Sequence, residues 1–476
     1  MFDAIKRMEQ RTVAILLGVA LLALAAACLL TMFTPAVAGG VLLALILCVV
    51  SFLSTDAALY ILIFAMVLSP ELTVGVTGGT SLGRGVTLRV DDFLLLVIGL
   101  SWLARAAVHK EVGLLAKTPI NRQLFAYILV TLVSTLLGVM FGRVEPKTGL
   151  LFVLKYFEYF FIYFMVVNHV KDPRQVRRFV AAMLVTCAIL GLIGVAQIPA
   201  GERVSAPFEG KAGEPNTFGG YLLLQMGFVI AFLLTANSCE LRWKFLLAML
   251  LPLITVPFLF TLSRTSWIAS VPMATAFLIL GPRKKYAILL LIFAVIAGPV
   301  LMPAKVKERV EYTFEWESPD LVQVGDLTVD PSASARLRQW QRTLSELPDH
   351  PFLGHGVTGS KFFLDAQYFR VLIETGILGM AAFAWLFVSL FRGANALRRE
   401  ADDPFYQALS LGFVVGIISM LAHGVGANTF IIVRIMEPFW FYGGLVMMYP
   451  HLKSTTEEHT PRLAAPAAPG LARRLR

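Results

Sequence analysis

Residues 244–280 read KFLLAMLLPLITVPFLFTLSRTSWIASVPMATAFLIL, and this stretch decides the fold class. It holds two apolar runs, 244–262 and 265–280, which are separated only by Ser263 and Arg264. An apolar run approaching about 20 residues can cross the hydrocarbon core of a bilayer as an α-helix. The stretch therefore predicts two consecutive transmembrane helices, joined by a tight turn that carries one arginine.

Runs of this kind recur along the whole chain. The sequence is 57% hydrophobic and only 15% charged, with a mean hydropathy of +0.73. A soluble protein of 476 residues would need much more polar surface. We therefore predict an all-α, polytopic integral membrane protein with about 12–14 transmembrane helices. Short alternating segments typical of a transmembrane β-barrel are not found.

The apolar runs set the predicted organisation. The first run is too long for a signal-peptide core, so we interpret it as a retained span. Residues 71–92, between the third and fourth runs, are rich in Gly and Thr and predict either a loop or a re-entrant segment, which leaves the helix count around 57–107 open. The predicted spans are 13–33, 36–53, 57–70, 91–107, 123–142, 149–168, 177–198, 217–236, 244–262, 265–280, 286–302, 367–391, 406–422 and 429–449. The chain accordingly divides into helices over 1–302, one long hydrophilic loop over 303–366, C-terminal helices over 367–450, and a tail over 451–476 whose composition predicts disorder.

Basic residues predict the orientation. The net charge is +10, and the Lys and Arg clusters fall mainly in short connections on one side of the predicted bundle. Such clusters mark the cytoplasmic side of a membrane protein, and this distribution does not indicate nucleic-acid binding. We therefore expect both termini in the cytoplasm and the loop 303–366 on the outer face.

The long outward loop has a pattern of its own. Leu337, Trp340, Leu344 and Leu347 recur at spacings of three and four, which predicts an amphipathic helix on the outer membrane surface, with Ser332 or Ser334 as its N-cap. Residues 350–360, HPFLGHGVTGS, then predict a Gly-rich turn that brings the chain back to the bilayer. Such a loop is usually functional, although it could also serve only as a surface cap.

Cations on the outward side predict an anionic ligand. Arg264 sits in the tight turn, where a fixed guanidinium suits bidentate binding of a phosphate; the alternative is that it reaches lipid headgroups. Arg203 and Lys211 lie in the Gly-rich loop before the span at 217–236. Asn216 follows in the same loop, where capping of that span explains it equally well.

Three further residues were considered for chemistry. Asp365, where the loop re-enters the bilayer, could be a general base if partial desolvation raises its pKa, or a helix N-cap. His355 is either a base or a hydrogen-bonding turn residue. Glu374 is expected to pair with Arg370 at i−4 and to be structural.

Deep charges are expected to be few. Lys155 and Glu158, one helical turn apart, are expected to pair, although they could line a polar cavity instead. His423 and Arg434 flank the last outward turn and could reach the same polar cavity as Lys155 and Glu158. No metal-ligand spacing is present, so we expect neither a metal nor another cofactor.

In order, five stretches of the chain resemble a known superfamily. They are LKYFEYFFIYFMVVNHVKDPRQVRR (154–178), EPNTFGGYLLL (214–224), TLSRTSWIA (261–269), SARLRQWQRTLSELPDHPFLGHGVTGS (334–360) and DAQYFRVLIETGILG (365–379). Together they resemble the O-antigen ligase and O-antigen polymerase superfamily of bacterial envelope glycan enzymes. The resemblance runs from about residue 150 to 450, and the block from Arg336 and Trp340 to Gly379 is its most specific part.

The resemblance implies a metal-independent, inverting glycosyltransferase at the periplasmic face of the bacterial inner membrane. Its donor would be an undecaprenyl-diphosphate-linked glycan and its acceptor another glycan or lipid A-core, with membrane lipids and a chain-length regulator as further partners. Asp365 would activate the acceptor hydroxyl and Arg264 would stabilise the diphosphate. Further contacts to the diphosphate or the glycan are implied for Arg203, Lys211, Asn216, Arg336, His355 and Tyr368.

One motif distinguishes the branches of this superfamily. In ligases the re-entry motif reads His-Asn-x-[Tyr/Leu]-Leu, whereas residues 365–369 here read Asp-Ala-Gln-Tyr-Phe. The aspartate is more like the polymerase branch, so we predict a polymerase, with a ligase as the alternative. A lipid-linked glycan flippase or transporter is a second alternative, but it should carry many charges deep in its spans, and only Lys155 and Glu158 are expected there.

Overall fold

The computed structural model describes residues 117–207, 213–289, 330–360 and 364–450 without interruption, and shorter stretches within 46–100, 291–292, 303–328 and at 452. Seven described helices are long and apolar enough to cross a membrane. They are α5 (Asn121–Met140), α6 (Pro146–His169), α7 (Pro173–Gln197, extended by the 3-10 turn η1, Ile198–Ala200), α8 (Pro215–Leu234), α9 (Leu241–Phe260), α14 (Gln367–Glu400) and α15 (Pro404–His423). The predicted all-α, polytopic membrane architecture is confirmed.

The remaining described elements are shorter. Three apolar helices complete the bundle: α3 (Thr55–Leu68), α10 (Arg264–Leu280) and α16 (Val433–Met447). The long loop contains α12 (Ala304–Glu311), α13 (Pro331–Glu346) and the turn η2 (Leu347–Asp349), and η3 (Thr429–Ile431) precedes α16. Two antiparallel pairs, β1 (Glu71–Thr73) with β2 (Thr87–Arg89) and β3 (Gln323–Val324) with β4 (Leu327–Thr328), lie in connections. The predicted spans 13–33, 36–53, 91–107 and 286–302 lie wholly or mostly outside the described residues.

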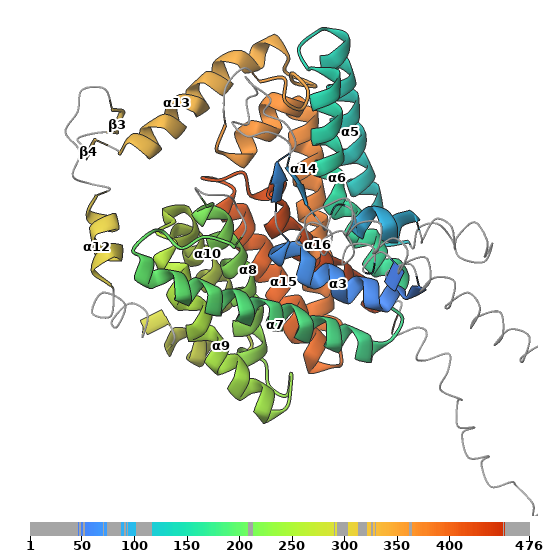
Figure 1. Cartoon of the computed structure of the whole chain (residues 1–476), viewed down its shortest axis with the longest axis vertical. Helices are drawn as coiled ribbons and strands as arrows, with labels where there is room; N and C mark the ends of the chain where they lie inside the picture. The colour runs from blue at the N-terminus through green and yellow to red at the C-terminus, as the bar shows by residue number, and fades with distance from the viewer. Residues whose placement is uncertain are drawn as a thin grey trace, which may run out of the picture.

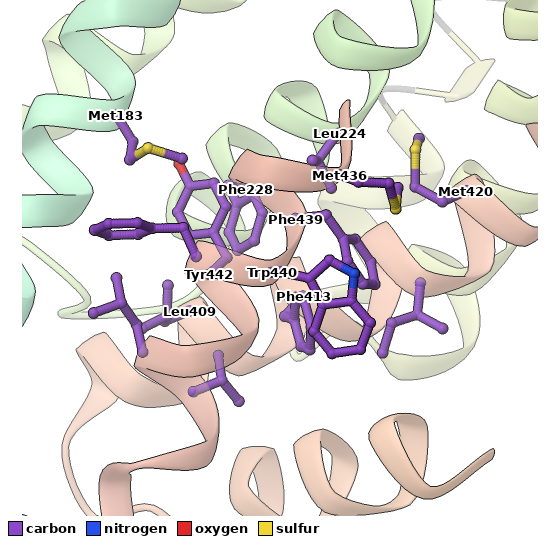
Figure 2. Packing of buried hydrophobic residues seen from close by; sticks show 14 of the residues in the cluster. Met183, Leu224, Phe228, Leu409, Phe413, Met420, Met436, Phe439, Trp440 and Tyr442 are labelled. Carbon is purple, nitrogen blue, oxygen red and sulfur yellow. The ribbon is translucent and has the colours of Figure 1, made fainter. Parts of the chain in front are cut away.

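The centre of the bundle is formed by α8, α15 and α16 (Figure 1). In the most apolar 18-residue segment of α8, 94% of the residues are buried, against 28% in the corresponding segment of α9. The helix α8 is therefore an inner helix, and α9 lies at the rim of the bundle. Phe228 of α8 stacks on Tyr442 of α16 with ring centroids 3.8 Å apart, as Figure 2 shows. Because small residues let helix backbones approach closely, Gly412 of α15 accommodates the Phe228 ring.

A break in α14 organises the side of the bundle that faces the long loop. The helix is interrupted at Gly376, whose φ of 66° and ψ of −166° are not helical. Residues 350–360 fit into this break, and we call the contact the α14 interlock. Its four backbone hydrogen bonds are Ile377 N–H to Pro351 O (2.8 Å), Leu378 N–H to Phe352 O (3.2 Å), His355 N–H to Ile373 O (2.8 Å) and Gly356 N–H to Glu374 O (2.9 Å). The turn thus pairs backbone groups that the broken helix cannot pair by itself.

Glycine is required where the two backbones touch. A Cβ atom on Gly376 would lie 2.4 Å from the carbonyl of Phe352, and one on Gly354 would lie 2.6 Å from the backbone of Glu374. Both residues also have φ of +66°, which is strained for any other residue. The glycines of the predicted turn therefore do allow a close backbone approach, and the partner is α14.

The amphipathic helix predicted from Leu337 to Leu347 exists as α13, but its predicted cap is wrong. The N-cap is Asp330, whose carboxylate accepts a hydrogen bond from the Ser332 amide at 3.0 Å. Pro331 occupies the first helical position, where no N–H is needed, so the cap lies before the two serines. On the apolar side, Trp340 stacks on Phe369 of α14 at 5.0 Å.

More charge is buried than the sequence indicated. The pairs Lys155–Glu158 (3.0 Å) and Arg370–Glu374 (3.5 Å) form as predicted. Arg89, Arg434 and Glu437 are also buried inside the bundle, so Lys155 and Glu158 are not the only charged side chains enclosed in the described structure. Arg434 donates to the carbonyls of Val67 (2.6 Å) and Ser69 (3.1 Å) at the C-terminal end of α3, where helix carbonyls lack intrahelical partners.

We expect a methyl group at the centre of the α14 interlock to lower the stability of the folded protein. Gly376→Ala should lower the thermal unfolding temperature of the detergent-purified protein by several degrees, since this backbone region costs a non-glycine residue about 1–3 kcal/mol before any clash. Gly227→Ala in α8 is the matched control, because the nearest atom to its Cβ would be 3.7 Å away. Equal unfolding temperatures for Gly376→Ala and the wild type would show that the interlock is dispensable.

Candidate functional site

Arg264 begins α10 directly after the tight turn from α9, and it ties the long loop to the bundle. Its Nη1 and Nη2 donate to the two carboxylate oxygens of Asp330, each at 2.7 Å. Burial alone would raise the pKa of Asp330, but the hydrogen bonds and charge of Arg264 hold it below the usual range. Arg264 therefore holds the N-terminal end of α13, and the alternative that it extends to lipid headgroups does not describe this structure.

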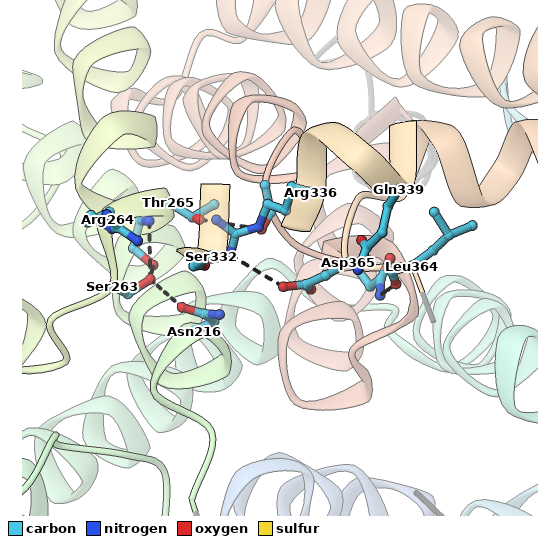
Figure 3. Close-up of polar contacts among 12 residues, drawn as sticks. Asn216, Ser263, Arg264, Thr265, Ser332, Arg336, Gln339, Leu364 and Asp365 are labelled. Atoms are coloured by element: carbon cyan, nitrogen blue, oxygen red, sulfur yellow. Dashed lines mark hydrogen bonds and ion pairs between the residues drawn. The ribbon is translucent and has the colours of Figure 1, made fainter. Parts of the chain in front are cut away.

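A second ion pair lies further along α13. Arg336 Nη2 donates to Asp365 Oδ2 at 3.3 Å, and the Asp365 amide donates to Gln339 Oε1 at 3.1 Å. Residues 336 and 339 are one turn apart, so both face the segment before α14. Figure 3 shows Arg336 between Arg264 and Asp365. The Asp365 side chain is 29% exposed, so it is accessible and partly desolvated.

Two capping alternatives are excluded by the geometry. The N-cap of α14 is Ala366, whose methyl side chain cannot form a capping hydrogen bond, and the Asp365 side chain is paired with Arg336. The N-cap of α8 is Glu214, also without one. Asn216 instead accepts a hydrogen bond from Ser263 Oγ at 2.8 Å.

Four arginines converge here, and we call Arg203, Arg264, Arg309 and Arg336 the arginine cluster. Arg203 Nε and Nη2 donate to the carbonyls of Thr261 (3.0 Å) and Leu262 (3.2 Å), beside Arg264. Burial lowers the pKa of Arg203, and the charges of Arg309 and Arg264 lower it further. Burial likewise lowers the pKa of Arg309, with Arg264 adding to the effect. Arg336 Nε is buried and has no hydrogen-bond partner among the described atoms.

The cluster combines guanidinium groups with nearby carboxylates. Glu214, Asp330 and Asp365 are among the carboxylates that act on its four arginines. Planar guanidinium groups are well suited to binding phosphate oxygens in pairs. Lys211, predicted to join them, lies outside the described residues.

His355 and Tyr368, also predicted as site residues, make their contacts elsewhere. His355 belongs to the α14 interlock, where its Nδ1 lies 3.3 Å from Ile373 O and its ring meets that of His350 at 4.8 Å. Tyr368 donates to Leu421 O at 2.5 Å inside the bundle. His423 Nε2 lies 3.0 Å from Oγ of Ser266, which follows Arg264 by two residues in α10.

Three residues of the site were missed by the sequence analysis: Asp330, Gln339 and Arg309. The Asp330–Pro331 pair before a helix is a known N-cap pattern and could have indicated the cap. Gln339 follows Arg336 by one turn, so a shared face was readable from the spacing. Nothing in the sequence around Arg309 indicated its position in the cluster.

One comparison with known proteins gives a match in this part of the chain. Residues 247–384 match the sequence profile of a protein family described as O-antigen ligase. The match extends from α9 into α14, so it contains both ion pairs, Arg264–Asp330 and Arg336–Asp365. No curated protein matches the chain.

The anchor at the start of α13 is testable without an activity assay. Asp330→Asn should keep the cap, because Asn caps as well as Asp, but should lose the charge pair with Arg264. We expect hydrogen–deuterium exchange in the first two turns of α13 to rise about tenfold in Asp330→Asn and in Arg264→Ala. Arg342→Ala is the control, since its pair with Glu346 is exposed on the same helix. Unchanged exchange in both anchor variants would contradict the anchor.

The anchor also has a pH dependence. Because the pKa of Asp330 is lowered in the folded protein, the pair contributes its full stabilising free energy at every pH above the ordinary pKa of aspartate, about 4. Its contribution should be lost only as the pH falls through the lowered value. The protection of the α13 amides against hydrogen–deuterium exchange should therefore stay constant from pH 7 to about pH 5.

Proposed function

We propose that the chain is a glycosyltransferase of bacterial envelope glycan assembly, because residues 247–384 match the profile of the family described as O-antigen ligase. Its specific reaction is polymerisation: an undecaprenyl-diphosphate-linked oligosaccharide is transferred to the sugar hydroxyl of an acceptor glycan. The site faces the periplasm and both termini lie in the cytoplasm. The observation that carries the proposal is a single guanidinium, Arg336, which contacts a carboxylate inside a cluster of cations.

The arginine cluster fits the diphosphate of the donor. When the glycosidic bond breaks, negative charge develops on the leaving diphosphate, and fixed guanidinium groups stabilise it without reorganising. Arg336 is paired with Asp365 through Nη2, so a diphosphate bound at the cluster would lie next to the proposed base. The lipid chain of the donor is held by the bilayer, which positions the diphosphate.

Asp365 fits the role of general base. Arg336 and Gln339 hold its side chain and its amide, so the carboxylate is oriented before the substrates arrive. In the proposed step the acceptor oxygen forms a bond to the anomeric carbon and its proton passes to Asp365. The bond to the diphosphate breaks, and its electron pair leaves with the diphosphate. Attack opposite the leaving group inverts the configuration.

A ligase is the second candidate, because the matching family is described by that activity. Asp365 stands where the ligase motif has histidine, and this difference favours the polymerase. In a ligase the same cations would hold the same donor, and the acceptor would be lipid A-core.

The proposed base gives a direct prediction. Asp365→Asn keeps the size of the side chain and an acceptor for Arg336, but cannot take a proton, so transfer should fall by about 10²–10⁴-fold. The measurement is elongation of undecaprenyl-diphosphate repeat units by purified protein, without lipid A-core. His355→Ala should retain more activity, because it removes only an interlock side chain. Full activity in Asp365→Asn would remove the base from this residue, and strict dependence on lipid A-core would identify a ligase.

The proposed orientation has its own test. In a variant whose natural cysteines are replaced, Ser345→Cys on α13 should react with an impermeant maleimide in intact spheroplasts. Lys284→Cys, in the basic connection after α10, should react only after lysis. Both positions are exposed in the structure, so burial does not confound the comparison. The reverse labelling would place the site on the cytoplasmic face.

A further inference from the structure

A buried row of hydrogen-bonded side chains runs from the end of α15 to the start of α8, and we call it the polar row. Its links are Thr429 Oγ1 to His423 Nδ1 (2.7 Å), His423 Nε2 to Ser266 Oγ (3.0 Å), Ser266 Oγ to Ser263 Oγ (2.8 Å) and Ser263 Oγ to Asn216 Oδ1 (2.8 Å). All members except Asn216 are at most 1% exposed. A row of this kind inside an apolar bundle is stable only if every member is paired.

The direction of the row follows from its last link. Asn216 Oδ1 is an acceptor only, so the Ser263 hydroxyl must donate to it. Ser263 Oγ must then accept the proton of Ser266, and Ser266 Oγ must accept from Nε2–H of His423. The lone pair on His423 Nδ1 is left to accept from Thr429. With the Asn216 amide in this orientation, His423 must therefore be the tautomer that carries its proton on Nε2.

The helix α8 is shaped to admit the row. A Cβ atom on Gly219 would lie 2.4 Å from Ser266 Oγ, and one on Gly220 would lie 3.1 Å from His423 Cε1. Two consecutive glycines inside a helix cost about 1 kcal/mol each relative to alanine. The clearance that they provide is occupied by the middle of the row.

The row ends beside the arginine cluster. Ser263 immediately precedes Arg264, and the charge of Arg336 acts on His423. Since Oδ1 of Asn216 is bound to Ser263, its amide nitrogen is turned away from the row. In Figure 3 this nitrogen points toward the side of the view where Asp365 lies.

We propose that the polar row is a positioning network that turns the Asn216 amide N–H groups toward an oxygen of the anion bound at the arginine cluster. The identity of that anion as a diphosphate rests on the proposed function. In this arrangement His423 is a positioning residue, which acts through Ser266 and Ser263 and never touches the substrate. Asn216 then supplies an uncharged hydrogen-bond donor among the charged guanidinium groups, and this donor helps to orient the bound anion.

The tautomer is the first test, and it requires no substrate. Nitrogen-15 NMR of histidine-labelled protein in lipid, with His423→Gln to assign the signal, should show His423 neutral and protonated on Nε2 at pH 7. This readout separates a directed row from simple packing, because packing does not select a tautomer. A proton on Nδ1 would mean that the row runs in the reverse direction, which would overturn the proposal.

Binding is the second test, with farnesyl diphosphate as the probe and a fluorescence or calorimetric titration of the detergent-purified protein. Asn216→Ala should weaken binding about tenfold, the scale of a hydrogen bond to a charged group. Ser266→Ala should weaken it several-fold, although it never touches the probe. Ser419→Ala is the matched control, since this serine is buried in α15 and bonds only Val415 O within the described structure.

The outcomes separate the two proposals. Wild-type binding in Asn216→Ala would overturn the polar row as a positioning network, while the donor site would stand. Equal loss in Ser266→Ala and Ser419→Ala would mark a packing effect and also overturn it. Absence of binding in the wild type would overturn the diphosphate site, and the assigned role of Asn216 with it.

Discussion

In the α14 interlock, the backbone of residues 350–360 pairs the amides and carbonyls that the break at Gly376 leaves open. Backbone groups that are buried without a hydrogen-bond partner would each cost several kcal/mol, so the turn and the helix cannot separate independently. The turn is the direct continuation of α13 through η2. Closing the interlock therefore fixes the C-terminal end of α13, while the Arg264–Asp330 pair fixes its N-terminal end. A helix of the loop tied at both ends can hold Arg336 and Gln339 against Asp365.

One buried charge pair, Arg370 with Glu374, serves the same segment. Arg370 donates to Leu364 O at 2.8 Å, and Asn428 donates to the same carbonyl at 2.5 Å. Arg370 also contacts Glu374, just before the break, and Tyr156 donates to Glu374 at 3.2 Å. Removing one partner of such a buried pair typically costs about 3–5 kcal/mol. These charges thus hold the residue before Asp365, and their depth does not by itself indicate a transport path.

Local sequence rules predicted the parts of the molecule that depend on local physics. Apolar run length located the described spans, and the i, i+4 spacing gave the Arg370–Glu374 pair. The tight turn after α9 correctly predicted that Arg264 has little freedom. The Asp330 partner was not predictable in this way, because it lies 66 residues along the chain and only the tertiary fold brings the two together. The sequence predicted the Gly-rich turn, but it did not predict the contact of this turn with α14, because that contact is also formed only in the tertiary fold.

The two ion pairs of α13 differ in what an incoming anion would require of them. Both terminal nitrogens of Arg264 already bind Asp330, so a phosphate at Arg264 must compete with a carboxylate that is 1% exposed. Arg336 uses one terminal nitrogen, Nη2, for Asp365, and this pair is partly exposed. On this geometry we propose that Arg264 contributes by fixing α13 and by its charge, and that Arg336 links the proposed anion to the proposed base.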